Sequence, residues 1–439
     1  MNQDDFFALA DDLAAARRGN EQLFCWLDGE DSDFVRLNGN RVRQAGHVRR
    51  RALHLTLIDG ERQVEGDGEL AGSPAVDRDR SRELLARLRD RLPHVPADPF
   101  LHVSTDPSAS DRAVGESGPP TEIAIETLLA AAEGLDLVGI WASGAIRQGL
   151  VSSYGHRHWH QSQSFHLDWS AYLERDKAVK ASYAGLTWEP EQLTRTVAEQ
   201  RAQLALIARP PRDLAPGRYR AYLAPAAVEE LLGLLAWRGF DLKSHRTSQT
   251  PLLRLVRGER AFAPAITLTE EFGRGLMPGF TAEGFVTPAS VPLIEAGRYA
   301  QCLVDARDGR EYGVPVNAAG GAPESLAMAA GEIADEAILT RLDTGLYIGN
   351  LWYSNWSDPN DCRLTGMTRF ACFWVADGEI VAPIPVMRFD DSLYHLLGER
   401  FEGLTQRREQ RLAADTYGGR STASALLPGL LVGGIDLTL

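Results

Sequence analysis

The middle of the chain holds the feature that most constrains its fold, a segment at 209–217 that contains the adjacent prolines Pro210 and Pro211. Two consecutive prolines lack backbone N–H donors and restrict the residue before them, so neither a helix nor a strand can continue through this segment. A chain of 439 residues is also too long for one ordinary hydrophobic core. We therefore predict two domains, residues 1–211 and residues 212–439.

Before this boundary, helical and strand-like patterns follow one another. Apolar residues recur at helical spacing over 4–18, and Leu53, Leu55 and Leu57 alternate with smaller or polar neighbours, as in a half-buried strand. Further helices are expected at 81–92, 121–134 and 190–208, and further strands at 22–28, 33–37, 41–45, 47–58, 135–142, 146–154, 156–168 and 170–183. These patterns predict an N-terminal domain of antiparallel sheet with flanking helices.

After the boundary, a strand is predicted at 218–224 and a helix at 225–237, because Pro225 suits the first turn of a helix. From Ile266 onward, short runs punctuated by glycine and proline predominate. This pattern is typical of a β-rich, sandwich- or barrel-like domain. We expect the chain as a whole to be of the α+β class.

Composition narrows the possible locations and partners. No run approaches the ~18 consecutive apolar residues of a membrane span, and the first residues are acidic and amphipathic, unlike a signal peptide. We therefore expect a cytoplasmic protein without a membrane partner. The net charge of −14 argues against nucleic acid, whose phosphates need a basic stripe. The four cysteines form no CxxC pair, so neither a disulfide framework nor a cysteine-rich zinc site is expected.

A long, ordered series of residues in the second half of the chain carries a family resemblance. The series comprises GLYIGNLWYSNWSD at 345–358, LTGMTRF at 364–370, FWV at 373–375, GEIVAP at 378–383 and VMRFDDSLY at 386–394. It resembles the TldD/PmbA family of metallopeptidases, also labelled modulators of DNA gyrase, and in particular the TldE-like branch. The resemblance covers essentially the whole second domain and, more weakly, the first.

This resemblance implies a cytoplasmic protease of two related subunits that acts on unfolded polypeptides or peptides. The TldD-like subunit carries HExxxH on the helix after the strand at 218–224, where the histidines bind zinc and the glutamate acts as general base. Here the three motif positions fall near Gly233, Leu234 and Arg238, and no histidine of the chain is followed by glutamate. The resemblance therefore implies no catalytic residue, metal or cofactor in this chain, and places zinc in a TldD-like partner of a heterodimer.

The strand expected at 156–168 carries His156, His158 and His160 on one face. Two alternate imidazoles can share a metal ion, although no carboxylate lies within the repeat. The same face could instead bind an extended polypeptide, or it could be a plain solvated surface. The residues on this face also include Ser152, Tyr154, Ser162, Ser164 and His166.

Four residues of the 345–358 segment form a second candidate for substrate binding, namely Trp352, Tyr353, Asn355 and Trp356. Aromatic side chains at this density are typical of core packing. Interleaved with asparagine and serine, they are also typical of a subunit interface or a peptide-binding groove.

Two alternative functions stay open from the sequence. One is a self-sufficient metal-dependent hydrolase that uses His156, His158 and His160. The other is a regulatory binding protein. A nucleophilic pair of Cys372 and His395 is not favoured, because Cys372 lies in an apolar strand where a small core residue is expected.

Overall fold

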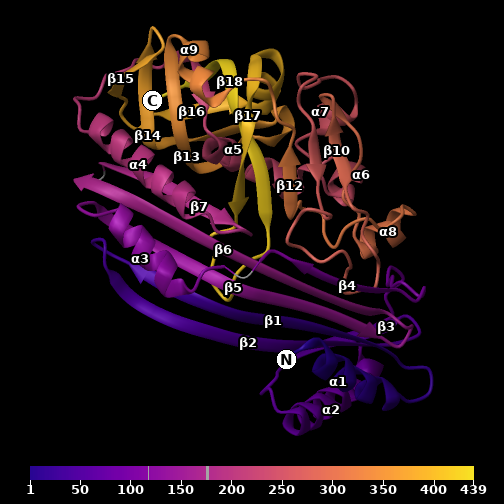
Figure 1. The fold of residues 1–439 in the computed structure, drawn as a ribbon. Coiled ribbons are helices and arrows are strands. Elements are labelled where there is room, and N and C mark those ends of the chain that lie inside the picture. Colours follow the sequence, from indigo (N-terminus) through magenta and orange to yellow (C-terminus); the bar gives the residue numbers. More distant parts are fainter. Residues whose placement is uncertain (117, 175–176) are drawn as a thin grey trace.

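The computed structural model describes residues 1–116, 118–174 and 177–439, and it contains two β-sheets with helices packed on them (Figure 1). A seven-stranded sheet is built from the first part of the chain, and an eleven-stranded sheet from the second. The structure confirms the predicted α+β class. No helix in the described residues is long and apolar enough to cross a membrane.

The first sheet has the strand order β3-β2-β1-β5-β6-β4, with β7 also paired to β6. All its pairings are antiparallel except the one between β4 and β6. The strands are β1 (Gln22–Leu37), β2 (Val42–Asp59), β3 (Arg62–Glu69), β4 (Ala109–Val114), β5 (Asp136–Ser152), β6 (Arg157–Glu174) and β7 (Lys177–Gly185).

Strands β1, β2 and β5 are each longer than predicted, because glycines lie inside them and not at turns. Gly144 lies within β5 with φ +143°, and a Cβ there would come 2.1 Å from the carbonyl oxygen of Asp31 on β1. Only glycine permits this close approach of two paired backbones. The prediction of separate strands at 135–142 and 146–154 is therefore wrong, and so are the separate strands at 22–28 and 33–37.

Four helices pack against one face of the first sheet. Leu23, Cys25 and Leu27 of β1 pack with the helices nearest the N-terminus, whereas Val35 and Leu37 of the same strand pack with the next two. These helices are α1 (Gln3–Ala15), α2 (Pro74–Arg91), α3 (Thr121–Ala131) and α4 (Pro190–Ile207). The other face of the sheet is directed toward the second part of the chain (Figure 1).

In the second sheet five strands close on themselves. The order β18-β16-β14-β13-β8 is completed by pairing between β8 and β18, which agrees with the predicted barrel-like domain. The strands are β8 (Gly217–Leu223), β9 (Leu268–Glu270), β10 (Val291–Glu295), β11 (Arg298–Tyr299), β12 (Ser325–Met328), β13 (Gly345–Asp358), β14 (Arg363–Ala376), β15 (Glu379–Pro383), β16 (Arg388–Ser392), β17 (Phe401–Leu412) and β18 (Ser424–Leu437). The helices are α5 (Pro225–Gly239), α6 (Leu242–Arg246), α7 (Leu253–Val256), α8 (Ala306–Tyr312) and α9 (Ile338–Leu342).

Two arginines hold the parts of the chain together. Arg112 of β4 donates to the carbonyls of Phe272, Gly273, Gly275 and Met277 at 2.9–3.2 Å. Arg420, in the β17–β18 connection, is 8% exposed and donates to the carbonyls of Ser164 (2.9 Å) and Gly144 (3.1 Å) of the first sheet. All strands of the first sheet precede Pro210 and all of the second follow it. The division into two domains at 211/212 stays a prediction.

Candidate functional site

Helix α5 is where the resemblance places the metal motif, and the structure shows which of its sides is open. The helix begins at Pro225 and packs against β13, where the Ala224 N–H donates to the Ile348 carbonyl at 2.9 Å. Its buried side is apolar and consists of Ala227, Val228, Leu231, Leu232 and Leu235. The opposite side is wholly or partly exposed and includes Glu229, Glu230, Gly233, Leu234 and Trp237.

The three motif positions do not fit a zinc ion. Gly233 is exposed and has open space around it, Leu234 is half-buried, and Arg238 is exposed. The helix also ends in a kink, because Trp237 has ψ 100° and Arg238 has φ 72°. A glycine offers no ligand atom, a leucine is apolar and an arginine remains a cation, so no residue here can replace a histidine or a general base.

Beside α5, strand β13 has a free edge. Strand β8 pairs only with Leu346, Tyr347 and Ile348, and within the described ranges no strand takes up that edge after Ile348. The carboxylate of Glu230 on α5 accepts the Ser354 N–H at 3.4 Å. Apart from the Ser354 N–H, this edge of β13 offers an extended polypeptide backbone groups that no other strand pairs with in the described residues.

A bulge in β13 exposes its aromatic side chains. The register with β14 shifts between Trp352 and Asn355, and Tyr353 has φ 56°. Trp352 is 51% exposed and Tyr353 is 76% exposed, so core packing is the wrong interpretation for these two residues. Trp356 differs, because it is partly buried against the main core of the second sheet. Asn355 is exposed, and its side chain accepts the Trp356 N–H at 2.8 Å.

A cavity of about 630 Å³ opens at the start of α5 and β13. It lies between strand β7 and helix α4 on one side and strands β13 and β17 on the other, and its walls include Ala226, Gly349 and Asn350. Two of its basic wall residues are paired with carboxylates, since Arg411 lies 2.7 Å from Glu229 and Lys180 lies 3.1 Å from Asp168. The cavity therefore adjoins the first turn of α5 and the part of β13 where its pairing with β8 ends.

The three histidines of the candidate strand lie in the interior of the protein. His156, His158 and His160 are each at most 1% exposed, so the interpretation of a solvated face is wrong. Serine hydroxyls engage both ring nitrogens of His158, Ser110 at 2.7 Å and Ser108 at 2.9 Å, and one ring nitrogen of His160 lies 2.7 Å from the Leu276 carbonyl. Burial lowers the pKa of His158 and of His160 to about 4, which keeps both rings neutral at pH 7.

Strand β6, which carries these histidines, has almost no free edge. It pairs with β5 on one side, whereas β4 covers residues 157–162 and β7 covers most of the rest on the other. An extended substrate therefore cannot add a strand beside His158 and His160. The expectation of a substrate track here is wrong for the chain as it folds, because β4, a strand that the sequence patterns did not predict, occupies this edge of β6.

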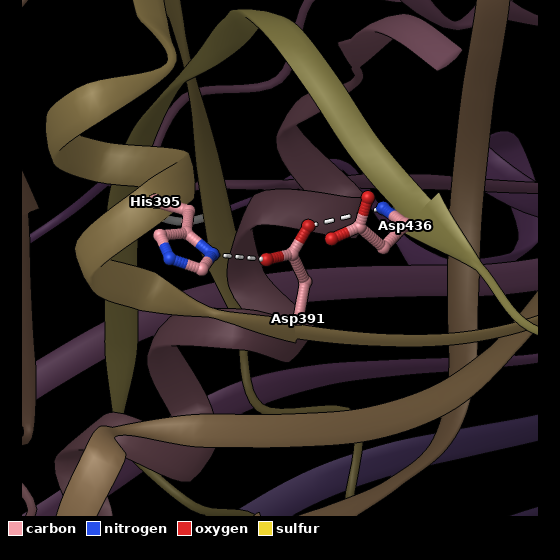
Figure 2. A group of neighbouring side chains, drawn as sticks. All are labelled: Asp391, His395 and Asp436. Carbon is pink, nitrogen blue, oxygen red and sulfur yellow. Dashed lines mark hydrogen bonds and ion pairs between the residues drawn. The ribbon is translucent and has the colours of Figure 1, made fainter. Parts of the chain in front are cut away.

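One group of side chains in the described residues could geometrically hold a metal ion, namely Asp391, His395 and Asp436 (Figure 2). The His395 ring lies 2.8 Å from Asp391, whose other oxygen accepts the Asp436 N–H at 3.0 Å. Arg400 already bridges both carboxylates, at 2.8 Å from Asp391 and 3.2 Å from Asp436. The guanidinium supplies the positive charge, so this group is an ion-pair network that joins β16 to β18.

The charges around Asp436 agree with the assignment of this group as an ion-pair network. Burial alone would raise the pKa of Asp436, but the hydrogen bonds and charges of Arg218 and Arg400 lower it. Asp391 is completely buried and also accepts the Ser392 N–H at 2.8 Å. No sequence pattern pointed to this network, although Asp391 lies within the 386–394 part of the family series.

Comparison with known proteins identifies the family. The model of the PmbA/TldA metallopeptidase C-terminal domain matches residues 216–438, which is half of the chain, and the chain therefore belongs to the TldD/PmbA family. A search of curated proteins finds no match.

Solved structures share this fold over nearly the full length of the chain. A candidate modulator of a DNA gyrase from Thermotoga maritima is 15% identical, with a TM-score of 0.76 over 99% of this chain and 100% of the other. TldE from Thermococcus kodakarensis is 15% identical, with a TM-score of 0.77 over 95% and 97%. A candidate modulator of DNA gyrase from Bacteroides thetaiotaomicron is 13% identical, with a TM-score of 0.77 over 100% and 98%. At these identities the likeness shows the fold alone.

Proposed function

We propose that this chain is the TldE-like, non-catalytic subunit of a two-component metallopeptidase of the cytoplasm. The observation that carries the proposal is the open side of α5, where Gly233, Leu234 and Arg238 stand at the motif positions. A helix that lies beside β13 but offers no metal ligand at the motif positions suits a subunit that shapes a site and leaves the chemistry to its partner. Zinc and the general base then belong to a TldD-like subunit in a heterodimer.

The substrate in this proposal is an unfolded polypeptide or a peptide, and its contact with this chain is the free edge of β13. Backbone groups beyond Ile348 can pair with an extended chain of any sequence, which suits a substrate without a fixed motif. The exposed rings of Trp352 and Tyr353 lie on the same strand and provide apolar contact. Asn355 and Trp356 remain part of the proposed site, whereas His156, His158 and His160 leave it because they are buried.

The alternative of a self-sufficient hydrolase at His156, His158 and His160 has no support from the geometry. Serine hydroxyls already engage both ring nitrogens of His158, and these three rings do not converge on a common point in the described part of the chain. A metal site needs several ligand atoms within reach of one ion.

Reconstitution tests the proposal. The chain and an HExxxH-bearing relative are purified separately, and cleavage of an unfolded polypeptide is measured for each alone and for the mixture. We expect cleavage only in the mixture, because a metal centre acts on a polypeptide once the other subunit has aligned it. Full-rate cleavage by the relative alone would show that this chain is dispensable, and cleavage by this chain alone would show that it is an enzyme in its own right.

A further inference from the structure

The outer half of β2 is exposed on both of its faces. Each of the nine residues from Val42 to Arg50 is exposed, whereas the rest of the strand alternates between buried and partly buried positions. Helices α1 and α2 pack near the β3 end of the sheet and do not reach this half (Figure 1). A strand inside a sheet of this size normally buries one face.

This half of β2 also has a free edge. Strand β3 pairs only with residues 52–59 of β2, and in the described part of the chain no other strand pairs with residues 42–51 on that side. The Arg51 carbonyl points toward the β3 side, where it accepts the Leu70 N–H at 2.9 Å. Alternate residues of a strand direct their backbone groups to the same side, so Ala45, His47 and Arg49 direct their N–H and C=O groups outward, up to the bulge at Arg43. The open edge is about 30 Å long, at ~3.4 Å per residue.

The charge of this segment is opposite to that of the protein. Residues 41–51 read RVRQAGHVRRR, with five arginines, one histidine and no carboxylate, in a chain of net charge −14. Asp31 and Asp33 of β1 lie against His47, and Asp31 also pairs with Arg49. Arg43 lies on the same edge, and within the described residues no ion pair is recorded for it. Arg50 also pairs with Glu69 of β3, at 3.4 Å, so the edge keeps a net positive charge at the Arg43 end, beside unpaired backbone groups.

The charge disfavours a second copy of this chain as the occupant. Two β2 edges paired antiparallel about Gly46 would place Arg43 of each copy opposite Arg49 of the other. Like charges directly opposite each other on paired strands are destabilising. The same positive charge attracts a strand that carries carboxylates, so the edge discriminates against self-association and in favour of an acidic partner. Unpaired backbone groups over this length favour a polypeptide over nucleic acid.

We propose that the Val42–Arg50 edge binds an acidic, extended segment of the partner subunit, which adds a strand to the first sheet. This inference rests on the proposed function for the identity of the partner. The partner strand hydrogen-bonds to Ala45, His47 and Arg49, and its Asp or Glu side chains lie beside the arginines. The interface lies on the first sheet, whereas the substrate edge of β13 lies on the second.

Three variants of the full chain test the inference with an HExxxH-bearing relative as the probe. Ala45→Pro removes an outward N–H and leaves the hydrogen bonds to β1, and we expect it to weaken association about tenfold or more. Arg43→Glu should weaken association about tenfold and reduce its dependence on salt. Arg36→Glu is the matched control, because Arg36 is equally exposed but lies on β1, which is paired on both edges, and its affinity should stay within about twofold.

Amide hydrogen exchange in the complex is a second measurement. Slower exchange along the edge would not result from a change in surface charge alone. The amides of Ala45, His47 and Arg49 should exchange more slowly in the wild-type complex than in the free chain. If the two chains associate and cleave polypeptide together but both edge variants bind like the wild type, this inference is overturned and the proposed function stands. If the wild-type chain does not associate with the relative at all, both fall.

Discussion

Strands β6 and β13 both carry side chains that could bind a polypeptide, and the structure assigns them opposite environments. Strand β6 is paired along nearly its whole length, and its histidines are covered by the second part of the chain. Strand β13 has a free edge after Ile348, and Trp352 and Tyr353 are exposed. Polar residues at alternate positions of a strand therefore show which side chains share one face of the sheet. They do not show whether another part of the chain covers that face.

The largest expected effect is on the stability of the β6 region. His158→Ala removes a buried ring that is bonded to two serines and stacked on Phe280, at 4.7 Å between ring centroids. We expect unfolding in urea to show a loss of about 2–4 kcal/mol, from the cavity and the unsatisfied hydroxyls. Trp352→Ala on β13 is the control and should change stability by less than about 1 kcal/mol, because its ring is half exposed. Equal losses in the two variants would remove the distinction between the strands.

Substrate binding, in contrast, should depend on the exposed side chains of β13. In a complex with an HExxxH-bearing relative, the double change Trp352→Ala and Tyr353→Ala should raise the KM for an unfolded polypeptide about tenfold, because apolar contact with the substrate is lost. Tyr417→Ala, a change of a ring that is 97% exposed in the β17–β18 connection, should leave KM unchanged. An unaltered KM in the double variant would mean that β13 does not contact the substrate.

A smaller effect is expected from pH. The pKa values of His158 and His160 are about 4 in the folded chain, below the ordinary value of 6.5. The unfolded chain therefore binds more protons between pH 6.5 and pH 4, so these residues make stability fall as the pH decreases through this window. His158→Gln and His160→Gln should each flatten the pH dependence of the unfolding free energy there. If both variants keep the wild-type slope, buried neutral histidines do not stabilise the β6 interface.

Sequence patterns predicted the elements that follow from local rules. Pro225 correctly predicted where α5 begins, and the prolines at 210 and 211 lie between the two sheets in the sequence. Strand β4 was missed because Ala109–Val114 shows no apolar alternation, and its pairing with β6 is a long-range contact that no local rule reveals. The pairing is what removes the free edge of β6. The exposure of Trp352 and Tyr353 likewise depends on a bulge in β13, where the backbone of Tyr353 has a positive φ that its residue type does not favour.

The absence of a metal ligand at the three motif positions of α5 is the central claim of this account, and the most direct test measures where zinc resides. The complex of this chain with an HExxxH-bearing relative is analysed by native mass spectrometry, intact and after the two chains are separated without denaturation. We predict one zinc ion for each copy of the relative and none that stays with this chain, because Gly233, Leu234 and Arg238 provide no ligand atoms. Stoichiometric zinc that stays with this chain, and that persists when the relative's own histidines are changed to alanine, would contradict the account.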